Sequence, residues 1–122
     1  MNIADESANL IDFSQIDALL SAAGRDGVND IMQAFWRSTD NLTAQLRTQL
    51  EAEDFIEAAR TSHAIKGSAA NVGACRLATA ARSVENGCRN RDSASAIAAL
   101  DDLLLAYAET RRLMTAHIDA VA

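Results

Sequence analysis

The chain contains no proline, only five glycines and 4% aromatic residues in its 122 positions. A β-sandwich or barrel needs turn residues roughly every 8 to 12 positions and strands rich in β-branched and aromatic residues. Both are scarce here, whereas alanine, the strongest helix former, is abundant. The composition therefore predicts an all-α fold, and the length predicts a single domain over residues 1–122.

Basic residues are also in the minority, because 11 Lys and Arg stand against 17 Asp and Glu, a formal net charge of −6. Nucleic-acid binding rests largely on neutralising phosphates, so no nucleic-acid partner is expected. No segment reaches the ~18 consecutive apolar residues of a membrane span. The first residues carry acidic groups where a secretory signal needs basic ones. We therefore expect a cytoplasmic protein that does not bind a membrane.

Cysteine is rare, and the two that occur, Cys75 and Cys88, are too far apart for the Cys-x-x-Cys spacing of metal and redox motifs. Both fall within sequence that is expected to be helical. Free cysteine is among the most buried residue types. We therefore expect a buried, reduced pair.

Apolar residues at alternating spacings of three and four indicate amphipathic helices. Ser14, with Asp17 three residues later, is expected to cap the first helix, and Gly24 is expected to end it. The predicted helices cover 14–23, about 27–51, Asp54 to a stop at Gly73, about 74–89, and from near Asp92 almost to the C-terminus.

The same spacing predicts which side chains face inward. The expected inward positions include Val28, Ile31, Phe35, Leu46, Phe55, Ala58, Ser62, Ile65, Ala69, Val72, Leu77, Ala81, Val84, Cys88, Ile97, Leu100, Leu104, Tyr107, Met114 and Ile118. Connections of only a few residues force long helices that are neighbours in sequence to run antiparallel. The expected architecture is an antiparallel up-down four-helix bundle over about 27–121, with the short helix 14–23 capping one end.

One face of the third predicted helix does not belong to its core stripe. It carries His63, with Lys66 at i+3 and Gly67 at i+4 on the same side. Glycine inside a helix costs about 0.8–1.0 kcal/mol relative to alanine, and a side chain at position 67 would lean back over position 63. We interpret the missing side chain as a feature that leaves the imidazole accessible.

A neutral imidazole can act as a nucleophile, and a phosphoryl group that it accepts needs nearby cations. Lys66 supplies one cation. Arg82, Glu85 and Arg89 form a polar strip on the fourth predicted helix, which can face His63 across a groove. The spacing of Glu85 and Arg89 also fits an ordinary surface ion pair.

Other chemistries find less support. No second His, Cys or carboxylate lies at metal-ligand spacing around His63, so no metal site is expected. Ser68 has no evident general base, and the chain has no glycine-rich nucleotide-binding loop. The second histidine, His117, is expected to be a surface residue near a helix end.

The run HAIKGSAANVGA at 63–74 resembles the His-x-Leu-Lys-Gly-Ser-x-x-x-x-Gly-Ala signature of histidine-containing phosphotransfer (HPt) domains. The stretch from Val84 and Glu85 to Arg89 and Asp92 is similar to that family's Leu-Glu-x-x-x-Arg-x-x-Asp stretch. Sensor-kinase dimerisation domains differ, because an acidic residue typically follows their phosphohistidine, with a proline a few positions later.

The resemblance implies a role for each matching residue. His63 would be the phosphoacceptor, Lys66 would help to hold the phosphoryl oxygens, and Gly67 would keep the ring accessible. Arg89 would be a second positive or receiver-contacting group, and Glu85 falls where members place a polar residue that can contact or orient the histidine. The implied function is a phosphorelay: His63 accepts a phosphoryl group from a receiver-domain aspartate, or from a kinase, and passes it to the aspartate of a response-regulator receiver.

The resemblance also implies receiver domains and a sensor histidine kinase as partners of a stoichiometric phosphocarrier that is not an enzyme. This mechanism does not require oligomerisation, and no leftover apolar heptad face demands a dimer, so we expect a monomer. It implies no cofactor bound by this chain, and Mg²⁺ on the partner receiver. One alternative is a non-transferring adaptor or inhibitor that docks to receivers or kinases. Another is a phosphohistidine phosphatase or hydrolase, which needs an activating base or ligand set that the sequence does not show.

Overall fold

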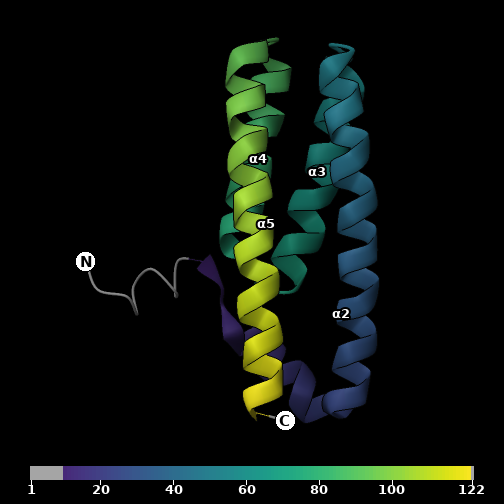
Figure 1. Cartoon of the computed structure of the whole chain (residues 1–122), viewed down its shortest axis with the longest axis vertical. Helices are drawn as coiled ribbons and strands as arrows, with labels where there is room; N and C mark the ends of the chain where they lie inside the picture. The colour runs from purple at the N-terminus through teal and green to yellow at the C-terminus, as the bar shows by residue number, and fades with distance from the viewer. Residues whose placement is uncertain (1–9, 122) are drawn as a thin grey trace, which may run out of the picture.

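A computed structural model describes residues 10–121, and within that range the chain is helical, with no strand (Figure 1). The helices are α2 (Phe13–Glu51), α3 (Phe55–Asn71), α4 (Cys75–Arg89) and α5 (Ser93–Val121). Helix α2 packs beside α3 and α5, and α4 packs beside the same two helices. The all-α prediction is confirmed. The expected domain includes residues 1–9 and 122, which lie outside the described residues.

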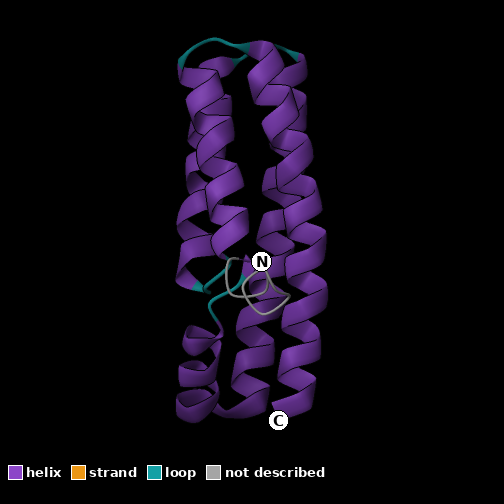
Figure 2. Cartoon of the chain, turned by 90° about the vertical axis from the view of Figure 1, so that its left-hand side faces the viewer, coloured by secondary structure: helices purple, strands orange, loops and turns teal. Residues whose placement is uncertain are grey.

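The connections between the helices are short, at 52–54, 72–74 and 90–92, and the chain reverses direction at each of them (Figure 1). Figure 2 shows that loops occupy little of the described chain beyond these connections. The predicted start at Asp54 is confirmed, because its carboxylate accepts the backbone N–H of Glu57 at 3.3 Å. Gly73, predicted as a stop, follows α3 with a left-handed φ of 80°.

The label α2 covers the first two predicted helices, which meet at a sharp break at Gly24, whose φ is 72° and ψ 178°. That backbone conformation favours glycine, so the predicted break is confirmed. The prediction of Ser14 as the N-cap is wrong. Asp12 caps α2 instead, because its carboxylate reaches both the backbone N–H of Ser14, at 3.0 Å, and its hydroxyl, at 2.6 Å.

The segment before Gly24 lies at the same end of the molecule as the C-terminal end of α5 (Figure 1). The ring of His117 stacks on Phe13 with centroids 4.1 Å apart, and its Nε2 lies 2.7 Å from a carboxylate oxygen of Asp17. Arg25 forms an ion pair with Asp119 at 3.2 Å. His117 is therefore more than a solvated helix-end residue, because it joins α5 to the start of α2.

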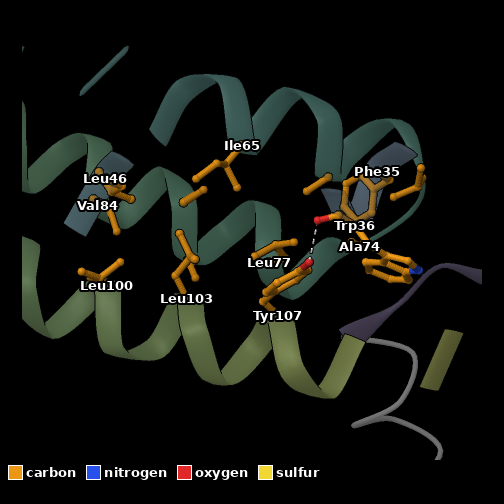
Figure 3. Close-up of a cluster of buried hydrophobic side chains, with 14 of the residues drawn as sticks. Phe35, Trp36, Leu46, Ile65, Ala74, Leu77, Val84, Leu100, Leu103 and Tyr107 are labelled. Atoms are coloured by element: carbon orange, nitrogen blue, oxygen red, sulfur yellow. Dashed lines mark hydrogen bonds between the residues drawn. The ribbon is translucent and has the colours of Figure 1, made fainter. Parts of the chain in front are cut away.

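The core runs along the centre of the four helices, and Figure 3 shows part of it, including Leu46, Ile65, Leu77, Val84 and Leu103. Most of the predicted inward positions are buried. Phe55 and Leu104 are half-buried, and two positions are exposed, Ile31 at 39% and Ile97 at 46%.

The error at Ile97 has a packing reason. A Cβ on Gly87 would lie only 2.9 Å from the backbone nitrogen of Ala96, so α4 and α5 approach closely at this point. The small side chain of Ala96 faces that contact and is fully buried. Neighbouring residues differ by about 100° around a helix, so burial of Ala96 turns Ile97 outward.

The expectation for the cysteines is half right. Cys88 is buried, but Cys75 is exposed, and both are free thiols. Cys75 is the first residue of α4, and its Sγ lies 3.4 Å from the carbonyl oxygen of Gly73. Leu77, two residues later, takes the fully buried position. None of the helices in residues 10–121 combines the length and apolar character that a membrane-spanning helix needs.

Candidate functional site

His63 projects from the middle of α3 with 63% of its side chain exposed. Its neighbours in sequence anchor the helix, because Ser62 and Ile65 are fully buried. The Ser62 hydroxyl donates to the carbonyl oxygen of Ala58 within the helix, so its polar group is satisfied. A well-packed inner face therefore fixes the direction in which the imidazole points.

Glu85 of α4 lies directly against this imidazole with only 6% of its side chain exposed. One of its oxygens lies 3.2 Å from Nδ1 of His63. Lys66 donates from Nζ to the other oxygen at 3.0 Å. Arg89 donates to the oxygen beside His63, from Nε at 3.1 Å and from Nη2 at 2.6 Å. The predicted residues from α3 and α4 thus converge on one carboxylate.

The charge state of Glu85 follows from these contacts. Burial by itself would raise the pKa of this carboxyl group, but hydrogen bonds from Lys66, Arg89 and His63 outweigh burial and lower the pKa to about 2. Glu85 is therefore a carboxylate at neutral pH. Its polar neighbours compensate a charge that would otherwise be costly to bury.

The carboxylate determines which nitrogen of His63 is free to react. A carboxylate can only accept hydrogen bonds, so the contact with Nδ1 requires a proton on that nitrogen. In the neutral ring, the lone pair then resides on Nε2. The arrangement makes Nε2 the nucleophilic nitrogen of an exposed ring, while the buried Glu85 carboxylate contacts Nδ1 on the other side of that ring.

Gly67 lies one turn after His63, and a Cβ added there would meet nothing within 4 Å. Packing therefore does not require glycine at this position, although a helix interior disfavours it. The open space agrees with the interpretation that Gly67 leaves the ring accessible.

An open groove of about 610 Å³ adjoins the ring. Its lining residues come from the N-terminal half of α3 and from the end of α4 and the connection after it: Phe55, Ile56, Ala59, Arg60, His63, Cys88, Arg89 and Arg91.

The structure corrects the predicted polar strip of α4 in two respects. Glu85 is not part of an ordinary surface ion pair, because it is buried at the centre of the site. Glu85 follows Val84 and lies four residues after Ala81, which puts it at the edge of the apolar stripe. Its spacing could therefore have predicted that it is buried. The side chain of Arg82 makes no hydrogen bond or ion pair with another residue in the described part of the chain.

Sequence reasoning missed Arg91, which lines the groove, because residues after a helix end carry no periodic pattern. Among residues 10–121, no three His, Cys, Asp or Glu side chains cluster closely enough to hold a metal ion.

Comparisons with known proteins agree with the fold. The family model of the Hpt domain matches residues 30–120. The fold is similar to that of a histidine-containing phosphotransfer protein from Medicago truncatula, with a TM-score of 0.83 and 21% identity, over 96% of this chain and 82% of that one. A maize histidine-containing phosphotransfer protein gives a TM-score of 0.81 and 22% identity, over 93% of this chain and 88% of that one. No curated protein sequence matches.

The family match covers most of the chain, and the chain therefore belongs to the Hpt domain family. Members of this family are phosphocarriers of two-component signalling, and this protein functions in phosphorelay histidine phosphotransfer.

Proposed function

We propose that His63 is the residue that carries the phosphoryl group. The observation that carries this proposal is the contact between Nδ1 of His63 and the Glu85 carboxylate at 3.2 Å. That contact directs the free lone pair to Nε2 on a ring that is 63% exposed. His117, the other histidine, instead stacks on Phe13 and contacts Asp17 at the end of the molecule.

The transfer step balances without any proton movement. The Nε2 lone pair of His63 forms the new N–P bond while the P–O bond to the receiver's aspartate breaks, and that aspartate leaves as a carboxylate. Nδ1 keeps its proton, so the ring becomes a phosphorylated imidazolium whose positive charge faces Glu85. The reverse step, with an aspartate of another receiver as nucleophile, restores the neutral ring.

The charge on the phosphoryl oxygens is offset by cations already at the site. Lys66 lies one turn from His63 and, together with Arg89, is held by Glu85 in the unphosphorylated protein. The phosphoryl group brings new acceptors beside these donors, and both side chains reorient toward it. Gly67 adds no side chain over the ring, so a receiver can approach Nε2 from that side.

The partners in this proposal are response-regulator receivers and a sensor histidine kinase, with Mg²⁺ bound by the receiver and no cofactor on this chain. The protein acts as a cytoplasmic monomer, binds neither nucleic acid nor membrane, and has no ATP-dependent kinase activity of its own. Residues 1–122 act as one Hpt domain. Its architecture is an antiparallel up-down four-helix bundle with a separate short helix before Gly24.

Transfer of labelled phosphate from a phosphorylated receiver domain tests the site. We expect His63→Gln to accept no label and His117→Gln to accept label at the wild-type rate, since His117 lies on the far end of α5. The adduct on the wild-type protein should be acid-labile, as expected for a phosphohistidine. Label on His63→Gln would contradict the assignment. Receiver binding without label on the wild-type protein would favour the adaptor instead.

A further inference from the structure

The groove beside His63 extends to one side of the ring only, toward the start of α3 and the end of α4. Its apolar lining includes Phe55, Ala59 and Ile56, whose exposure of 61% is high for so large an apolar residue. Three arginines, Arg60, Arg89 and Arg91, line the same groove. The groove thus combines apolar surface with positive charge in a chain of net charge −6.

Arg91 differs from the other two arginines because its side chain forms no ion pair within residues 10–121. Arg60 is paired with Glu57 at 3.0 Å, and Arg89 with Glu85 at 2.6 Å. Arg91 is exposed and forms no ion pair with any residue between 10 and 121. Its charge is therefore available to a partner without first breaking an internal contact.

The backbone of Arg91 also sets it apart. Its N–H donates to the carbonyl oxygen of Cys88 at 3.0 Å, and the N–H of Asp92 donates to that of Gly87 at 2.9 Å. These two bonds form a Schellman motif, in which glycine is the usual residue at the left-handed position. Arg91 occupies that position with a φ of 53°. The local structure therefore favours glycine, and no side-chain hydrogen bond or ion pair within residues 10–121 explains the arginine.

Resting on the proposed function, we infer that Arg91 is a docking residue for the receiver. A receiver presents its acceptor aspartate, and the Mg²⁺ that accompanies it requires further oxygen ligands, which proteins supply mainly as carboxylates. The rim of such a site is acidic and complements the arginine side of this groove. The partner surface that fits is apolar where it covers Ile56 and acidic where it meets Arg60 and Arg91. Arg91 acts on encounter and orientation, and the chemical step belongs to His63.

Glu53 offers a matched control. It follows α2 in the same Schellman geometry, also with a φ of 53°, but it is acidic and does not line the groove. Arg91→Gly and Glu53→Gly relieve the same backbone strain at equivalent positions. Arg91→Lys keeps the charge and the strain together.

The experiment measures transfer from a purified receiver domain, phosphorylated on its aspartate with acetyl phosphate, over a range of receiver and salt concentrations. We expect Arg91→Gly to unfold at the same temperature as the wild type or higher. Its second-order transfer rate at low salt should fall roughly two- to fivefold, the range of exposed charge contacts. The deficit should shrink at high salt, and the rate at saturating receiver should stay unchanged. Arg91→Lys should restore most of the rate, and Glu53→Gly should lose none.

Two results would overturn the docking role while leaving the phosphoacceptor assignment intact. One is a wild-type second-order rate in Arg91→Gly, and the other is an equal loss in Glu53→Gly, which would point to loop geometry instead of charge. If the wild-type protein takes no label on His63 at all, the proposed function itself fails, and the docking role fails with it.

Discussion

Replacing Glu85 with glutamine removes the charge at the centre of the site and keeps the size of the side chain. The lowering of the Glu85 pKa from 4.5 to about 2 corresponds to roughly 3 kcal/mol at 1.36 kcal/mol per unit. The Arg89 side of the cluster is open to solvent, with 65% of that side chain exposed, and solvent screens its contribution. We therefore expect Glu85→Gln to lower the free energy of unfolding at pH 7 by ~1–2 kcal/mol.

The pH dependence of this loss has a definite sign. A carboxyl group whose pKa is lower in the folded state stabilises the fold above its unfolded pKa, and this stabilisation disappears as the pH falls through the folded pKa. For Glu85 that window extends from about 4.5 down to about 2. The difference between the wild type and Glu85→Gln should therefore be constant near neutral pH and vanish toward pH 2.

Urea unfolding at several pH values provides the measurement. The single tryptophan, Trp36, is only 5% exposed, so its fluorescence reports loss of the core. Glu109→Gln is a suitable control, because Glu109 pairs with Arg112 on the exposed surface of α5. This substitution should change the free energy of unfolding by less than about 0.5 kcal/mol. A Glu85→Gln deficit that persists unchanged from pH 7 to pH 2 would refute the attribution to the carboxylate charge.

Three further substitutions probe other parts of the molecule. Gly67→Gln should keep or raise the unfolding midpoint, because the space around position 67 is empty and glutamine is the better helix former. It should slow phosphotransfer, because the new side chain lies over His63, and an unchanged transfer rate would remove the access argument. Gly87→Ala should lower the free energy of unfolding, measured in urea, by ~1–3 kcal/mol, because its Cβ would lie 2.9 Å from the backbone of Ala96. An unchanged free energy would disprove close α4–α5 packing there. His117→Ala should speed amide exchange in 13–23 by removing the contacts with Phe13 and Asp17, and equal protection in both proteins would count against that role.

The helices themselves could be predicted with good accuracy, because their signals are local. The break at Gly24 and the stop at Gly73 each depend on one residue that tolerates a left-handed backbone. The start at Asp54 depends on a carboxylate that reaches a backbone N–H three residues later. The N-cap was wrongly predicted at Ser14, because Asp12, two residues earlier, can also accept hydrogen bonds from the free N–H groups of the first turn.

The candidate site was predictable where it lies within one helix. His63, Lys66 and Gly67 are neighbours on α3 because of the helical repeat alone, so their spacing identified them. The role of Glu85 was not predictable in the same way. Its contacts with the donors of His63 and Lys66 on α3 depend on how α4 is rotated and shifted against that helix.

The sequence by itself therefore determined the all-α class, the helix boundaries to within a few residues, and a polar face around His63, because each rests on interactions within a few turns. Only the tertiary structure decided that Glu85 is buried at the centre of the site, that Ile97 and Cys75 are exposed, and that Arg91 borders the groove. These features depend on the rotation of one helix against another. Successive residues differ by about 100° around the helix axis, so the packing of Gly87 against Ala96 determines which neighbouring residue is buried.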